Sequence, residues 1–552
     1  MNSQVEYKVA KTDDISSGEM KEFPIPGFSS GSGDSKKDEL KILLAKVGKQ
    51  YIASAPKCTH YGAQLVKGVI SPTGQVTCPW HGACFNLCQN GDIEDAPAWD
   101  ALPTFKTIVR DNDIYVCLPD INILKSGRRP PIFAKSNATA DSHVVIVGGG
   151  ASGYSTAECL RTYGFNGKIT VISKENYYPI DRTKLSKALI TDPSEIEIRG
   201  QADIAKLGID FIKNTTVSSI DTYNKTISLS TGSTLNYTKL VLATGGSPKR
   251  LSLAGFDSEN VYTLRTVDDT KKIVDSVSGG RKKVVVIGSS FIGLEIALPL
   301  AKEHDVTVVG MEAAPLERVL GVKVGNAIKK LHEKAGIKFR LSAEIKGATA
   351  SSGRVQSVQL GGEESLQADV VVLGVGVYPE TSYFDNPATK TSIQREKDGS
   401  IAVDGHMRVK GVENVYAVGD IAKFPYPQLS VTLRVEHWDV AMNQGRTAAQ
   451  HIAKGDAAEP YNATLFFWSA QGSQLRYCGT TAPPVGFDDV MIQGSLDDAT
   501  FAALYLKEDK VVAVASMGYD PAVALSSQLM ARGVMPSRSD LESKDIRDFA
   551  NV

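Results

Sequence analysis

Two short segments near the start of the sequence each supply one cysteine and one histidine. Cys58 stands two positions before His60, and 17 residues separate His60 from the next segment, which holds Cys78 and His81. A zinc finger instead pairs two cysteines in one segment and two histidines in the other. With one ligand of each kind from each loop, both thiolates can bind one iron and both imidazoles a second iron, as a mixed-ligand [2Fe–2S] cluster requires.

Glycines follow both histidines and allow each loop to turn sharply, at Gly62 and Gly82. The two segments resemble the ligand loops of Rieske ferredoxins, and the resemblance covers roughly residues 5–118. It implies that Cys58, His60, Cys78 and His81 hold a Rieske [2Fe–2S] cluster. A structural zinc site and a domain without metal are the alternatives.

Respiratory Rieske proteins carry an additional cysteine in each ligand loop, and the two form a disulfide. The matching positions here are Ala63 and Trp80, so the resemblance is to the ferredoxin type of lower potential. Cys84 and Cys88 are left over. They are expected either to pack in the domain core or to be redox-active.

A glycine-rich turn follows the apolar segment Val144–Val147 and precedes a predicted helix at Ser155–Tyr163. Its fingerprint glycines are Gly148, Gly150 and Gly153. They are expected to form the turn, admit a pyrophosphate at the helix N-terminus and let helix and strand approach. Glu175 follows the next predicted strand, Ile169–Ile172, and is expected to hold the adenosine ribose.

The same strand–turn–helix pattern returns at Lys283–Val309, with Gly288 and Gly293 in the turn. Ser290 stands where the middle glycine is expected, and it is small enough for a pyrophosphate to approach. This second site is predicted to take NADH or NADPH. Glu312 follows the next strand and favours NADH, because an acidic residue there binds the ribose 2′-hydroxyl.

Two further segments resemble motifs of the flavoprotein reductases that bind two dinucleotides. They contain Thr244-Gly245 and Gly419-Asp420. The resemblance implies that FAD occupies the first site and that Asp420 hydrogen-bonds its ribityl chain. The cysteine pair that disulfide reductases carry after the first fingerprint is missing, since Cys159 stands alone there.

Three other segments resemble bacterial ferredoxin reductases and apoptosis-inducing factor. They lie at 178–187, at 434–439 and at 467–469, and they contain Arg182, Lys187, His437 and Trp468. With the Rieske segment, the whole chain resembles the apoptosis-inducing-factor-3-like group. Tyr178-Pro-Ile departs from the Pro-Tyr order of that group, which weakens the expectation of flavin contacts from this turn.

The resemblance also implies roles for single residues. Lys187 is expected to pair with Glu295 beside the reactive edge of FAD, and Phe291 to pack against the nicotinamide. His437 and Trp468 are expected to line the flavin, with Arg182 among the cofactor-binding residues. The alternatives are that Lys187 and Glu295 are surface charges at helix starts and that the three rings belong to the core.

The predicted fold is multidomain, with an all-β Rieske domain, two α/β Rossmann-like domains and an α+β C-terminal domain. The predicted boundaries are 1–118 for the Rieske domain, 119–142 for a linker, 143–257 with 381–455 for the FAD domain, 258–380 for the NAD(P)H domain and 456–552 for the C-terminal domain. Residues 27–38, rich in Gly and Ser, are expected to form a mobile loop.

Composition excludes several classes of protein. The 552 residues contain 61 Lys+Arg against 62 Asp+Glu, so no net positive field favours nucleic acid. Seven cysteines in this length are too few for a disulfide scaffold. The sequence starts without a signal peptide and has no long apolar run, so we expect no membrane span and a cytoplasmic location.

These observations predict an oxidoreductase that passes electrons from NAD(P)H through FAD to its own Rieske cluster. The acceptor beyond the cluster is not identified; a ferredoxin, a cytochrome, an oxygenase or a quinone would fit. The alternatives are a redox-gated signalling protein with little turnover and the reductase component of a Rieske oxygenase system. The oligomeric state stays open, with a homodimer among the alternatives.

Overall fold

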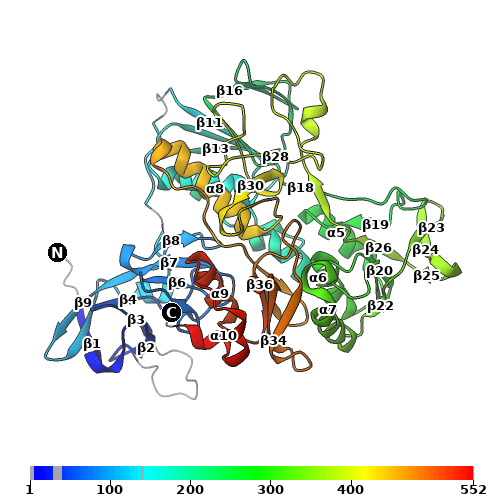
Figure 1. Ribbon diagram of the computed structural model, residues 1–552. Coiled ribbons are helices and arrows are strands. Elements are labelled where there is room, and N and C mark those ends of the chain that lie inside the picture. Colours follow the sequence, from blue (N-terminus) through cyan, green and yellow to red (C-terminus); the bar gives the residue numbers. More distant parts are fainter. Residues whose placement is uncertain (1–4, 29–39, 131, 138–140, 551–552) are drawn as a thin grey trace.

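The computed structural model describes residues 5–28, 40–130, 132–137 and 141–550. It confirms the predicted fold class, with four modules arranged as Figure 1 shows. Most of the Gly/Ser-rich loop predicted at 27–38 lies outside the described residues. Within the described ranges, no helix combines the length and the apolar character that are needed to cross a bilayer.

The first module is antiparallel. Six strands form one sheet in the order β1-β10-β9-β4-β3-β2. They are β1 (Val5–Lys11), β2 (Met20–Pro24), β3 (Lys41–Val47), β4 (Gln50–Ser54), β9 (Thr104–Arg110) and β10 (Asp113–Leu118). The predicted hairpin around Gly48-Lys49 is the turn between β3 and β4. A smaller sheet carries the second ligand loop and consists of β5 (Val69–Ile70), β6 (Gln75–Thr77), β7 (Cys84–Asn86) and β8 (Asp92–Asp95).

The second module is a parallel sheet in the order β13-β12-β11-β17-β29. Its strands are β11 (His143–Val147), β12 (Lys168–Ile172), β13 (Ile209–Ile212), β17 (Lys239–Leu242) and β29 (Val415–Ala417). Its central strands are apolar on both faces, as buried parallel strands are. Helix α2 (Ala151–Thr162) begins four residues before the predicted start, because Gly150 is its N-cap and the fingerprint glycine Gly153 lies within its first turn.

Two helices of this module pack closely. Gly445, in α8 (Trp438–Lys454), lies against the backbone of α2, and a Cβ there would stand 2.4 Å from the carbonyl oxygen of Ser152. A larger residue at this position would therefore push the helices apart. Both helices reach the edge of the sheet at which the nucleotide turns lie.

The third module is inserted into the second. Strands β18 (Gly246–Pro248) and β27 (Val377–Pro379) pair antiparallel and carry the chain out and back. Between them, a parallel sheet runs in the order β19-β26-β20-β21-β22. Its strands are β19 (Val261–Thr263), β20 (Lys283–Ile287), β21 (Asp305–Val309), β22 (Lys338–Arg340) and β26 (Val370–Leu373), with helices α5 (Val267–Val277), α6 (Phe291–Ala301) and α7 (Glu317–Lys334).

The fourth module is an antiparallel sheet covered by helices. Its strand order is β32-β33-β36-β35-β34. The strands are β32 (Phe466–Ala470), β33 (Gln474–Gly479), β34 (Asp489–Ser495), β35 (Thr500–Lys507) and β36 (Lys510–Met517), followed by α9 (Ala522–Ala531) and α10 (Arg538–Ser543). Figure 1 shows this module between the Rieske module and the third module. Strand β32 therefore faces several modules at once.

Candidate functional site

The two predicted cluster loops fold alike. In the first loop, the Cys58 amide donates to the Ala63 carbonyl oxygen at 2.8 Å, and the Gly62 amide donates to the Cys58 carbonyl oxygen at 2.9 Å. The second loop repeats both bonds, at 2.9 and 3.2 Å, with Cys78, Gly82 and Ala83. Gly62 and Gly82 have φ of +79° and +76°, where other residues are strained. Each loop therefore presents its cysteine and histidine in the same way.

Among the four candidate ligands, the two histidines lie together and the two cysteines lie together. Nδ1 of His60 lies 3.0 Å from Nδ1 of His81, and the buried thiols of Cys58 and Cys78 are neighbours, since the Cys78 thiol raises the pKa of Cys58. Burial lowers the pKa of His60 to about 4, so its imidazole is neutral, as a metal ligand must be. In the part of the chain that the structure describes, no three His, Cys, Asp or Glu side chains gather around one point. This pairing fits a two-iron cluster better than a single zinc ion.

Aromatic rings surround the two histidines. The indole of Trp468, in β32, lies 4.4 Å from the His81 ring and 5.6 Å from the His60 ring, measured between centroids. Tyr61 stacks on His60 at 3.8 Å, and its hydroxyl donates to the carboxylate of Asp181 in the FAD module. The histidine edge of the Rieske module thus faces the reductase modules.

A cavity of about 1100 Å³ opens beside this contact, between the second, third and fourth modules. Thirteen of the predicted site residues line it. They are Gly148, Gly150, Glu175, Arg182, Lys187, Thr244, Gly245, Phe291, Glu295, Gly419, Asp420, His437 and Trp468. Residues from distant parts of the sequence therefore form one site.

The first fingerprint has the shape that a dinucleotide needs. A Cβ on Gly148, whose φ is +115°, would stand 2.1 Å from the Ala243 carbonyl oxygen, and one on Gly153 would stand 1.9 Å from the Gly148 carbonyl oxygen. Gly150, in contrast, has open space on its Cβ side. Two glycines thus permit close packing of the turn, and the third leaves room for a pyrophosphate at the start of α2.

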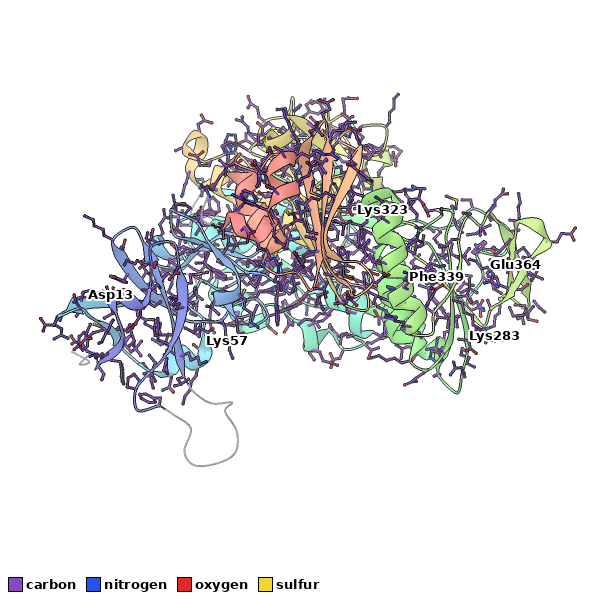
Figure 2. The ribbon with its side chains drawn as sticks, turned by 60° about the horizontal axis from the view of Figure 1, so that its bottom comes forward. Asp13, Lys57, Lys283, Lys323, Phe339 and Glu364 are labelled. Carbon is purple, nitrogen blue, oxygen red and sulfur yellow. The ribbon has the colours of Figure 1, made fainter. Side chains whose placement is uncertain are left out.

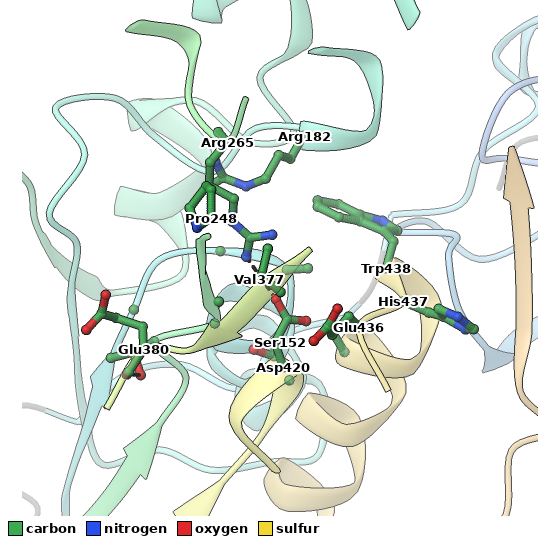
Figure 3. Close-up of a pocket in the computed structure, with 18 of the residues that line it drawn as sticks. Ser152, Arg182, Pro248, Arg265, Val377, Glu380, Asp420, Glu436, His437 and Trp438 are labelled. Atoms are coloured by element: carbon green, nitrogen blue, oxygen red, sulfur yellow. Dashed lines mark hydrogen bonds and ion pairs between the residues drawn. The ribbon is translucent and has the colours of Figure 1, made fainter. Parts of the chain in front are cut away.

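Charged residues converge in the cavity. The Arg265 guanidinium, which the sequence analysis missed, lies 2.9 Å from the carboxylate of Asp420, and Figure 3 shows the two side chains meeting. Glu175 and Arg182 form an ion pair at 2.8 Å. The carboxylate predicted to hold a ribose is therefore already fixed by an arginine. Asp420 and Glu175 remain in position to bind hydroxyl groups.

His437 is a second sign that the cavity takes a cofactor. It is partly buried, and the loss of solvation lowers its pKa to about 4. Its Nδ1 has no hydrogen-bond partner among the described residues, although its ring packs 4.6 Å from Phe467. A buried nitrogen without a partner is costly, so a bound flavin that meets this edge would stabilise it. These features fit FAD.

Lys187 and Glu295 meet as the resemblance implies. The Lys187 ammonium lies 3.0 Å from Glu295, whose carboxylate is 3% exposed. Glu295 also accepts hydrogen bonds at 2.5 Å from each of Ser186 and Ser469, and one at 3.0 Å from the amide of Ala470. One buried carboxylate therefore joins the second, third and fourth modules. Neither residue is a free surface charge.

The second fingerprint repeats the close packing of the first. A Cβ on Gly288 would stand 2.2 Å from the Gly374 carbonyl oxygen, and one on Gly293 would stand 2.1 Å from the Gly288 carbonyl oxygen. The hydroxyl of Ser290 donates to the same Gly374 oxygen at 2.7 Å. Serine can therefore stand in place of the middle glycine, because its hydroxyl has a hydrogen-bond partner beside the turn.

Glu312 lies beside this turn, where its carboxylate accepts a hydrogen bond from the Ser289 hydroxyl at 3.4 Å and pairs with Arg318 at 2.9 Å. Phe291, at the start of α6, lines the cavity and packs 4.8 Å from Phe467. Tyr178, the residue that departs from the related motif, packs on Phe211 instead. The turn at Tyr178 therefore presents its ring away from the cavity.

Several functional contacts were missed in the sequence. They involve Arg265, Ser186, Ser469 and the Tyr61–Asp181 pair, none of which the sequence patterns assigned to a contact. Ser186 and Ser469 each adjoin a predicted residue, so their position in the resembling segments was the signal available. Arg265 had no such neighbour.

Comparison with known proteins agrees with this geometry. Family models match residues 5–106 as a Rieske [2Fe-2S] domain, 142–445 as pyridine nucleotide-disulphide oxidoreductase and 466–550 as reductase C-terminal. Apoptosis-inducing factor 3 of Mus musculus is 37% identical over 546 residues, which are 98% of this chain and 86% of that protein. Rhodocoxin reductase of Rhodococcus erythropolis is 31% identical and covers 68% of this chain and 86% of its own length.

Solved structures extend the comparison to the fold. The covalent complex of putidaredoxin reductase with putidaredoxin contains a chain that is 29% identical, with a TM-score of 0.68; the match covers 75% of this chain and 98% of that one. The family matches imply FAD and a [2Fe-2S] cluster as cofactors. The chain therefore belongs to the pyridine nucleotide-disulphide oxidoreductase family, as an NAD(P)H-dependent oxidoreductase of the ferredoxin-reductase type that is joined to a Rieske domain.

Proposed function

We propose that this protein passes electrons from NAD(P)H through FAD to its own Rieske cluster, and from there to an acceptor outside the chain. The position of Trp468 carries the proposal. This one side chain lines the cavity and also contacts the rings of His81 and His60. An electron that leaves the cavity towards the cluster thus has a path of touching aromatic rings.

When bound, FAD supplies the chemistry that connects a two-electron donor to a one-electron carrier. The residues of the chain place and tune it. Lys187 holds a positive charge at the cavity wall, and Glu295 fixes that ammonium from a buried position. A cation there stabilises the electron-rich form of a flavin. Trp468, 8% exposed, keeps water out of the contact between the cavity and the histidines.

The Rieske module is held firmly on the reductase modules, which supports transfer within one chain. Asn443 accepts from the Ala96 amide at 2.9 Å, and the Arg446 guanidinium donates to the Ile93 carbonyl oxygen at 2.6 Å. On the fourth module, Gln528 donates to the Gln75 carbonyl oxygen at 3.0 Å. A carrier attached in this way meets its donor without diffusion.

The test uses the full-length protein loaded with both cofactors, without oxygen. NADH should bleach the flavin absorbance, and the Rieske EPR signal should then appear. Trp468→Ala should slow the second step and leave the first unchanged, while His81→Cys should remove the Rieske signal and leave flavin reduction intact. A cluster that stays oxidised beside fully reduced flavin would disprove the proposal.

A further inference from the structure

The reductase covers the face through which the cluster is expected to be reduced. His81 is 6% exposed and packs on Trp468, and the glycine after it, Gly82, lies against the ring of Phe466. A carrier protein from solution cannot reach the histidines through this face. Electrons that leave the chain therefore need another surface near the cluster.

Two aromatic rings beside the ligands stay exposed. Tyr61 is 37% exposed and stacks on His60, with its ring plane 19° from that of the imidazole. Trp80 is 40% exposed, and its ring lies 6.2 Å from that of His81. Tyr61 directly follows the candidate ligand His60, and Trp80 directly precedes the candidate ligand His81. Together they connect both imidazoles to the solvent.

The exposed charges beside the Tyr61 ring are positive. The Lys184 ammonium lies 4.9 Å from the centre of that ring. The Arg128 guanidinium pairs with Asp100 at 3.1 Å, and the carbonyl oxygen of Asp100 accepts a hydrogen bond at 2.6 Å from the hydroxyl of Thr59, the residue before His60. The side chains of Lys184 and Arg128 are 39% and 50% exposed. The nearby carboxylates of Asp181 and Asp100 are 11% and 8% exposed. A protein that docks at this surface therefore contacts the two cationic side chains before it contacts the two carboxylates.

The Rieske module does not need to move to expose this surface. Arg129 and Ala101 exchange two backbone hydrogen bonds, at 2.9 and 3.0 Å, which hold the chain after the module against it. Further along, the Ala134 amide donates to the Arg161 carbonyl oxygen at 2.9 Å in the FAD module. The described parts of the connection are thus fixed at both ends.

We propose that Tyr61, Trp80, Lys184 and Arg128 form an exit surface, at which an acidic one-electron carrier protein docks and is reduced. The inference rests on the proposed function. Each carrier takes one electron, so one NAD(P)H reduces two carriers and yields NAD(P)⁺ and one proton. Charge complementarity favours an acidic partner over a basic one.

The test compares acidic cytochrome b5 with basic cytochrome c as acceptors for the loaded full chain, because a plant-type ferredoxin has a lower potential than a Rieske cluster and cannot oxidise it. At low ionic strength, Lys184→Glu should lower kcat/KM for cytochrome b5 by about tenfold and raise it for cytochrome c. Added salt should reduce both effects. Lys283→Glu makes the same charge change in the third module, on the opposite side of the molecule from the Rieske module in Figure 2, and should change neither rate.

Two further measurements separate the inference from the proposed function. The Kd of the oxidised protein for cytochrome b5 should rise with Lys184→Glu and not with Lys283→Glu. Trp80→Ala should slow reoxidation of the cluster by cytochrome b5 while the Rieske EPR signal after NADH is retained. If NADH fails to reduce the cluster before any carrier is added, the proposed function is wrong. If the cluster is reduced but Lys184→Glu and Lys283→Glu behave alike, the exit surface is wrong.

Discussion

Replacing Gly82 with alanine should separate the Rieske module from its electron donor. A Cβ at this position would stand 2.6 Å from Cγ of Phe466 in β32, well inside van der Waals contact. Gly62 offers a matched control, because it holds the same place in the other ligand loop, has nearly the same φ, and has no atom within 4 Å of its Cβ position. The two variants share the backbone strain and differ in the clash.

The magnitude follows from that difference. An alanine in this left-handed region costs about 1–2 kcal/mol in either loop. The clash adds the cost of overpacking, about 1–3 kcal/mol, and it acts only on the docked state. At about 1.4 kcal/mol for each factor of ten, Gly82→Ala should shift the balance from docked to undocked by about fivefold to 150-fold more than Gly62→Ala.

The assay is anaerobic stopped-flow absorbance with freeze-quench EPR. We expect NADH to reduce the flavin at the wild-type rate in both variants, and the cluster to be reduced more slowly in Gly82→Ala. The EPR amplitude after dithionite gives the cluster content of each sample, so that a lost cluster is not mistaken for slow transfer. Equal transfer rates in the two variants at equal cluster content would refute the reasoning.

Three further predictions concern the other sites. Asp420→Ala should weaken FAD binding about tenfold to 100-fold, since a hydrogen bond to a charged group contributes about 1.5–3 kcal/mol; an unchanged Kd for FAD would contradict this. Burial raises the pKa of Asp95 to about 6, above its unfolded value of about 3.9, so the native state binds the extra proton and loses stability as pH rises through this window. Asp95→Asn should therefore raise the melting temperature at pH 7.5 and not at pH 4; an equal rise at both values would count against the explanation. Glu312→Ala should lower kcat/KM for NADH relative to NADPH, and an unchanged ratio would show that Glu312 does not select the coenzyme.

The candidate sites could be predicted from the sequence because their residues lie in short segments. Cys58, His60, Cys78 and His81 lie in two short segments, and their residue types with their spacing indicate the ligand arrangement. Each fingerprint glycine acts on a turn only a few residues long. The fold class follows for the same reason, since strand, turn and helix alternate with a regular pattern.

The contacts between modules are not predictable in this way. Trp468 meets His81 across the interface of the first and fourth modules, and Tyr61 reaches Asp181 across another interface. Ser469 becomes a partner of Glu295 only after three modules have come together. Such pairs depend on how whole surfaces fit, and hydrophobic periodicity within one segment holds no information on that fit.

The ribbon formed by β18 and β27 has a consequence for protein engineering. Gly246 pairs with Pro379 and Pro248 with Val377, so the two ends of the inserted module leave the host sheet side by side. An insert whose ends are adjacent places little constraint on its host, whatever its own length or fold. Chimaeras with exchanged donor specificity should therefore be cut and rejoined at this pair of strands, and the new module should keep Glu295 and the apolar residues that pack on the fourth module.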